Sequence, residues 1–185
     1  MWPRADNRVL SGSDQASRQT AVIDVGSNSV RLVIYRIEGR SIWTIFNEKA
    51  LAGLGRNLPA TGRLSPEGVE TAIAALRRFR VALSGWDHAD IVAVATAAVR
   101  EASDGPQFLA RVEGETGFRL RVVSGAEEAR YAALGVIAGQ PDAAGVVGDL
   151  GGSSLELVHL DPDAPSGGVT LPLGPFSLGA PRPFA

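Results

Sequence analysis

Two short segments of the sequence have residue types that suit phosphate binding. Each has an aspartate at the end of an apolar run, followed by glycine and hydroxyl residues: Asp24-Val-Gly-Ser-Asn-Ser29 and Asp149-Leu-Gly-Gly-Ser-Ser154. Glycine lets backbone N–H groups approach an anion closely, and serine adds hydroxyl donors. An aspartate at such a turn can hold a metal ion or a water beside the phosphate, although it can also simply cap the turn. We expect the two turns to face each other and clamp a phosphate chain.

A third acidic group begins the segment Ser124-Gly-Ala-Glu127-Glu128. Ser124 and Glu127 have the spacing of a capping box, which gives Glu127 a structural role at a helix start. Glu128 has no such role, and a carboxylate facing a cleft at this position would act as a general base toward water. The alternative is a surface acid that the helix dipole stabilises.

Two arginines are candidates for phosphate contacts, because the guanidinium fork matches phosphate oxygens. Arg100 follows the apolar run Ile91–Ala95, and α/β sheets usually bind ligands beyond the carboxyl ends of their strands. Arg31 lies in the strand after the first turn, where an exposed structural role is the alternative.

Composition excludes several kinds of site. The 185 residues include no cysteine and only His88 and His159, which excludes disulfides and thiol nucleophiles and leaves little room for a histidine metal site. A net charge of -2 does not indicate nucleic-acid binding by bulk charge. No signal peptide is recognisable, and prolines interrupt the uncharged run 164–181, so we expect no membrane span and a cytoplasmic protein.

The order of predicted elements indicates an α/β fold with a mixed sheet and flanking helices. Residues 1–19 are expected to form a loose tail, and 53–62 a glycine-rich loop. Ser65-Pro66-Glu67 marks a helix start, and an apolar stripe predicts a helix to about residue 84. Ile91–Ala95 is typical of a strand buried on both faces. Further strands are expected at 21–25, 30–37, 41–46, 119–123, 145–150, 155–160 and 169–173, and further helices after Thr96 and at 106–115 and 126–138.

Four segments together resemble the signatures of the exopolyphosphatase and guanosine pentaphosphate phosphohydrolase family. They are Ala21–Leu32, Ala95–Ala102, Val123–Arg130 and Gly148–Glu156. The resemblance implies the actin-like ATPase fold, built from two ribonuclease H-like lobes. We then expect a first lobe over residues 20–124 and the start of an incomplete second lobe over 125–185. It also implies removal of terminal phosphate from inorganic polyphosphate or guanosine pentaphosphate with a divalent metal, expected to be Mg²⁺.

The same resemblance assigns roles to individual residues. It implies that Glu128 is the general base, and that Asp149 and Glu156 position the water and the metal. Asp24 would be the first-lobe acid and the third member of the metal set. Phosphate binding is expected from two loops and one arginine: Ser27, Asn28, Ser29 and Arg31; Gly151, Gly152, Ser153 and Ser154; and Arg100. No nucleic-acid or membrane partner is expected, and a homodimer is left open.

Departures from the family pattern keep two other functions open. Ser153 stands where the family usually has a third glycine, Leu155 stands where it has threonine, and the stretch 51–55 differs from the family's usual Arg-Leu-Gly-Glu-Gly. The second lobe would also be short. An actin-fold ATPase or kinase is one alternative. The other is an inactive phosphate-binding fragment that associates with another chain.

Overall fold

The structure, a computed structural model, describes residues 17–39, 41–86, 90–160 and 168–179 of the chain. No helix in these segments is long and apolar enough to cross a membrane. The elements in chain order are β1 (Arg18–Val25), β2 (Ser29–Glu38), β3 (Ser41–Leu51), α1 (Leu58–Thr61), α2 (Pro66–Leu83), β4 (Asp90–Ala95), α3 (Ala97–Glu101), α4 (Gly105–Thr116), β5 (Arg121–Val122), α5 (Gly125–Gly139), β6 (Gly145–Leu150), β7 (Leu155–Leu160), β8 (Val169–Leu171) and α6 (Pro175–Leu178).

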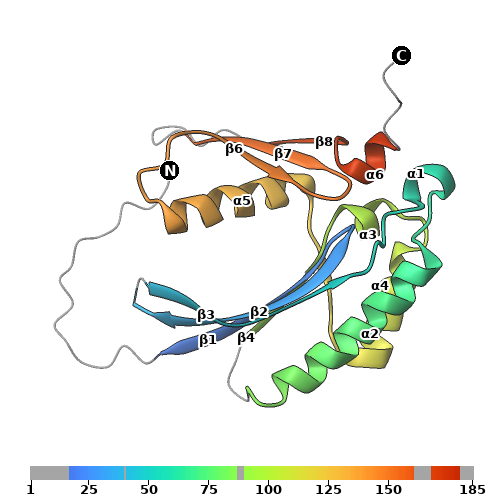
Figure 1. Cartoon of the computed structure of the whole chain (residues 1–185), viewed down its shortest axis with the longest axis horizontal. Helices are drawn as coiled ribbons and strands as arrows, with labels where there is room; N and C mark the ends of the chain where they lie inside the picture. The colour runs from blue at the N-terminus through green and yellow to red at the C-terminus, as the bar shows by residue number, and fades with distance from the viewer. Residues whose placement is uncertain (1–16, 40, 87–89, 161–167, 180–185) are drawn as a thin grey trace.

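Two sheets organise the molecule, as Figure 1 shows. The first has the strand order β3-β2-β1-β4-β5, in which β1, β2 and β3 pair antiparallel while β4 and β5 run parallel to β1. The second has the order β6-β7-β8 and is antiparallel. The α/β class and the mixed sheet with flanking helices are therefore confirmed.

Helix α2 supplies much of the hydrophobic core that packs against the first sheet. The Ser65 side chain caps it by accepting a hydrogen bond from the Gly68 N–H at 3.3 Å, and Pro66 occupies the first turn, as predicted. Its apolar stripe, including Ile73, Leu76 and Phe79, packs with Phe108 and Val112 of α4 against one face of the first sheet. Since α2 and α4 cover that face, the other face of the sheet is turned toward α5 (Figure 1).

The strand predicted at Ile91–Ala95 forms, but the prediction that both its faces are buried was wrong. Ile91 and Val92 of β4 are 44% and 47% exposed, and only Ala95 of this strand is buried. The reason is that β5 is two residues long and pairs only with Val94 and Ala95. The first half of β4 is therefore a sheet edge.

Other boundaries also differ from expectation. The first strand begins at Arg18, inside the segment expected to be a tail, while residues 1–16 lie outside the described residues. The glycine-rich loop contains the short helix α1, and α6 follows the last strand. The third strand continues five residues beyond Phe46, to Leu51, and this extension carries Asn47 and Lys49.

In the second sheet, α5 covers one face only. Ala129 and Ala133 of α5 pack on Val158 and Leu160 of β7. On the opposite face, Val146 and Leu150 of β6 are 66% and 64% exposed.

We predict that Phe79→Ala lowers the free energy of unfolding by about 3–5 kcal/mol, because Phe79 is fully buried and its truncation leaves a cavity. Urea denaturation followed by circular dichroism measures this. Val81→Ala, at a 73% exposed position of the same helix, is the matched control and should change stability by less than about 0.5 kcal/mol. Equal effects of the two substitutions would contradict the assignment of the core.

Candidate active site

The turn between β1 and β2 is held in place by the backbone that follows β3. Gly26 closes the turn by donating to the Ser29 carbonyl at 2.9 Å. The Asn28 carbonyl accepts hydrogen bonds from the N–H groups of Ala52 and Gly53, and the Ser27 carbonyl accepts one from Gly55 at 2.8 Å. The turn is thus fixed by residues 52–55, at the start of the glycine-rich loop for which the sequence analysis predicted no function.

The turn between β6 and β7 is held in the same way by the segment that follows β8. Gly151 donates to the Ser154 carbonyl at 2.9 Å. The Ser153 carbonyl accepts hydrogen bonds from the Gly174 N–H at 3.2 Å and the Ser177 hydroxyl at 2.6 Å, and the Gly152 carbonyl accepts from Phe176 at 2.9 Å. The two turns are therefore alike in sequence and also in structure, because in each a later segment of the chain donates hydrogen bonds to the turn's carbonyl groups.

The tips of the two turns touch each other. A Cβ atom added at Gly152 would lie 3.1 Å from the Ser27 Cβ and 3.2 Å from the Asn28 N, and one added at Gly55 would lie 3.0 Å from the Ser153 Oγ. The expected convergence is confirmed, and a side chain at either glycine would force the facing turn to shift by a few tenths of an ångström. The expected clamp is corrected in one respect: no phosphate group fits between the tips themselves, so an anion has to bind beside the contact or after the turns separate.

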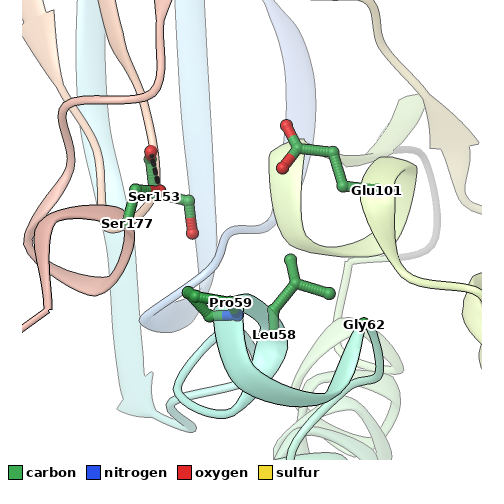
Figure 2. A pocket seen from close by; sticks show the side chains of 6 residues that line it. All are labelled: Leu58, Pro59, Gly62, Glu101, Ser153 and Ser177. Atoms are coloured by element: carbon green, nitrogen blue, oxygen red, sulfur yellow. Dashed lines mark hydrogen bonds between the residues drawn. The ribbon is translucent and has the colours of Figure 1, made fainter.

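The three serines Ser27, Ser153 and Ser154 are buried around this contact, whereas Asn28 is exposed and Ser29 begins β2. Ser153 lines a pocket of about 270 Å³ with Leu58, Pro59, Gly62, Glu101 and Ser177 (Figure 2). The pocket lining contains none of the acids Asp24, Glu128, Asp149 and Glu156. Ser153 therefore contributes to this pocket, and its buried Oγ has no hydrogen-bond partner among the described residues.

Two of the predicted acids lie directly opposite each other on neighbouring strands. Asp149 of β6 pairs with Glu156 of β7, so both side chains project from the face that α5 covers. Glu156 is 2% exposed, and its Oε1 has no hydrogen-bond partner among the described residues. Burial raises the pKa of Glu156, a hydrogen bond with the Ser154 side chain opposes the rise, and the carboxylates of Glu128 and Asp149 add to it.

Asp24, at the end of β1, belongs to the same group of charges. Desolvation by the surrounding protein raises its pKa to about 6, and the carboxylates of Glu128 and Asp149 contribute to the rise. The cations Arg31 and Lys49 act in the opposite direction. Acids from both sheets and from α5 therefore share one electrostatic environment.

Of the adjacent residues Glu127 and Glu128, only Glu127 takes part in the capping box, as the spacing predicted. Glu127 completes the capping box with Ser124, and hydrogen bonds from the Ser124 backbone and from Arg121 lower its pKa to about 2. The Glu128 side chain is 14% exposed and accepts a hydrogen bond from Arg100 Nη1 at 2.5 Å. The same nitrogen donates to the Val123 carbonyl at 2.8 Å, which anchors Arg100 at the junction between the sheets. Glu128 is therefore a largely enclosed acid paired with Arg100 and not a surface acid.

Arg31 lies beside Asp24 on β2, and its Nε donates to the Asn47 Oδ1 at 2.9 Å. Asn47 and Lys49 were missed because the third strand was predicted to end at Phe46. No sequence signal marks this extension, because Glu48 stands where the alternation of a half-buried strand would place an apolar side chain.

The predicted metal set of Asp24, Asp149 and Glu156 is not assembled as a cage. In the described segments, no three acid or histidine side chains lie close enough to hold an ion together. The donor set nevertheless suits Mg²⁺, which takes oxygen ligands and is commonly held by one or two carboxylates together with substrate phosphates. The unpartnered Glu156 Oε1, with Asp149 directly opposite, is the pair that fits this mode.

Residues 33–180 match the Ppx/GppA phosphatase family. The chain belongs to this family. Exopolyphosphatase 1 of Mycobacterium leprae is 34% identical over 156 residues, which are 83% of this chain and 46% of that protein. The crystal structure of an exopolyphosphatase from Cytophaga hutchinsonii superposes with a TM-score of 0.80 at 29% identity, covering 87% of this chain and 52% of that one.

The Aquifex aeolicus member of the Ppx/GppA family is 32% identical with a TM-score of 0.75, covering 86% of this chain and 52% of that chain. The actin-like ATPase fold expected from the sequence is therefore confirmed. The chain spans about half the length of the relatives it matches.

The shared charge of the acids predicts a pH-dependent effect of Asp24→Asn. The pKa of Asp24 in the folded protein, about 6, is above its ordinary value of 3.8, so ionised Asp24 destabilises the fold once the pH exceeds both values. Solvent limits the penalty to roughly 1 kcal/mol. Asp24→Asn should therefore raise Tm by roughly 2–4 °C at about pH 8, with the gain vanishing toward about pH 4.

Differential scanning fluorimetry across this pH range measures the difference from wild type. Asp142→Asn, at an exposed aspartate in the turn before β6, is the control and should show no such pH-dependent gain. A Tm gain from Asp24→Asn that is independent of pH would contradict the raised pKa.

Proposed function

We propose that this protein is a phosphoanhydride hydrolase that releases terminal phosphate from inorganic polyphosphate. The observation that carries the proposal is the meeting of the two glycine-serine turns beside four carboxylates, with Arg100 bound to one of them. Membership of the Ppx/GppA phosphatase family and the likeness to exopolyphosphatases support this reaction class. The chain covers about half the length of those relatives, so its own activity has to be measured directly.

In the proposed reaction, the Glu128 carboxylate takes a proton from a water molecule as that water attacks the terminal phosphorus. The bond from this phosphorus to the bridging oxygen breaks, and the shortened chain leaves with the electron pair on that oxygen. Glu128 suits the role because it is largely enclosed and held in the site. Asp149, on the strand that leads into the second turn, would orient the water from the other side.

Arg100 has to change partner for this reaction to proceed. In the structure its Nη1 is shared between Glu128 and the Val123 carbonyl, while its Nη2 lies 3.6 Å from Glu101. A guanidinium binds phosphate oxygens with the same fork geometry that it uses for carboxylates. An incoming phosphate would compete for Arg100 and leave Glu128 free to accept a proton. Arg100 would then stabilise the charge on the transferred phosphoryl group.

Mg²⁺ is the ion that we propose for this site, with Glu156 and Asp149 holding it. When bound, it would offset the charge of the phosphate oxygens and of the acids themselves. The unpartnered, buried carboxylate oxygen of Glu156 supports this assignment, since burial of such an atom is costly unless a ligand satisfies it.

Inorganic polyphosphate is the substrate proposed first, and guanosine pentaphosphate is the second candidate because it also ends in a phosphoanhydride. We further propose that residues 20–124 and 125–185 belong to two lobes of the fold, each supplying one turn. Apart from the first two residues of β1, the first sheet and its turn lie in the first range, and α5, the second sheet and its turn lie in the second.

The test is phosphate release from long-chain polyphosphate with Mg²⁺. Glu128→Gln should reduce the rate by at least about a hundredfold, the usual scale for loss of a general base. Glu127→Gln is the matched control at the neighbouring residue and should retain the rate, because glutamine still completes a capping box.

Two results would contradict the proposal in different ways. A wild-type chain that releases no phosphate from either substrate would remove the activity from this chain. Equal rates for wild type and Glu128→Gln would leave the reaction class standing but exclude Glu128 as the base. Circular dichroism of each variant checks that the fold is retained.

A further inference from the structure

Lys49 is the only lysine among the 18 Lys and Arg residues of the chain. It lies on β3, in the extension of that strand beyond Phe46. Register places it directly opposite Arg31 of β2, which is in turn directly opposite Asp24 of β1. Side chains of directly opposed residues project from the same face of a sheet, so the three form one row across three strands.

The row lies on the face of the first sheet that α2 and α4 leave uncovered. Its neighbours in the strands, including Val25 and Val30, are buried in the core on the opposite face. Asp24, Arg31 and Lys49 are all exposed. Two strand spacings of about 5 Å each separate the backbone of Lys49 from that of Asp24, so the row leads away from the acids over about 10 Å.

The two cations of this row differ from most arginines of the described segments. Most of those arginines are neutralised by a carboxylate within 4 Å, for example Arg63 by Asp104 and Arg77 by Glu115. Within the same segments, neither Arg31 nor Lys49 forms such an ion pair. The side chain of Asn47 fixes the direction of Arg31 through its Nε, which leaves the other guanidinium nitrogens open to a ligand.

We propose that Lys49 and Arg31 form a subsite for the phosphates of a polyphosphate chain that lie beyond the terminal one. This inference rests on the proposed function and names which part of the substrate these residues hold. A row of two exposed cations on strands recognises a linear polyanion by charge and spacing, and it contains no aromatic or apolar group to bind a nucleoside. Lysine suits this position because its ammonium is a compact charge on a flexible stem, which can follow successive phosphates.

The single lysine permits a direct test of contact. Acetylation with an N-hydroxysuccinimide ester modifies primary amines, and this chain has only two kinds: the Lys49 side chain and the α-amino group. Long-chain polyphosphate should slow modification of Lys49, as measured by mass spectrometry of peptides. Orthophosphate at equal phosphorus concentration should give no protection. Equal modification of Lys49 with and without the polyphosphate would overturn the proposal.

Substitutions test the energetic contribution. Lys49→Gln should weaken binding of long-chain polyphosphate about five- to tenfold, and it should reduce the slope of log affinity against log salt by about one, as loss of one phosphate contact does for other polyanions. Lys49→Arg should retain both values. The matched control is Arg119→Gln, which removes one positive charge from an 86% exposed side chain paired with Glu113 of α4.

The outcomes separate this inference from the proposed function. A wild-type chain that binds no polyphosphate contradicts both. A wild-type chain that binds polyphosphate, with Lys49→Gln and Arg119→Gln equally weakened or equally unaffected, contradicts the subsite alone. A loss of orthophosphate affinity equal to the loss for the long chain would also contradict it, because Lys49 would then contact the terminal phosphate.

Discussion

Mutual repulsion among Asp24, Glu128, Asp149 and Glu156 is the constraint on which this site depends. These acids come from β1, α5, β6 and β7, and the pKa values of Asp24 and Glu156 are raised first by burial and further by the neighbouring carboxylates. Only Arg100 forms a direct ion pair with one of the four within the described segments. An arrangement of this kind costs free energy in the folded protein, and a bound cation together with an anionic chain relieves that cost.

Hydrogen bonds to backbone carbonyls fix the two turns that stand beside these acids. Residues 52–55 tie the first turn and residues 174–177 tie the second, in both cases through carbonyl groups of the turn. The N–H groups of residues 27 and 28, and of residues 152 and 153, do not take part in these ties. Because these hydrogen bonds are accepted by carbonyl groups, the N–H groups at the tips of the turns are not used to hold the turns in place, and N–H groups are the donors that suit an anion.

Local signals in the sequence predicted the parts of the site that depend on local chemistry. The turns at Gly26 and Gly151, the capping box of Glu127 and the start of α2 all follow from neighbouring residue types. Features that depend on pairing with distant strands were not predictable. The extension of β3 depends on its pairing with β2 as far as Ser29, and β5 pairs with only the last two residues of β4, so the place of Lys49 beside Arg31 and the exposure of Ile91 required the structure.

The residues of the candidate site lie in both sheets, but the second sheet is covered on one face only. Both turns, the four carboxylates and the cations beside them all lie within residues 24–156. The outer face of the second sheet, however, leaves Val146, Leu150 and Val169 exposed, and no described residue covers them. The hairpin that carries Asp149 and Glu156 is therefore held by α5, by β8 and residues 174–177, and by the contact between the turns. Any partner or segment that covered this face would restrict the hairpin, so it would reduce the entropy lost when the two acids engage a ligand.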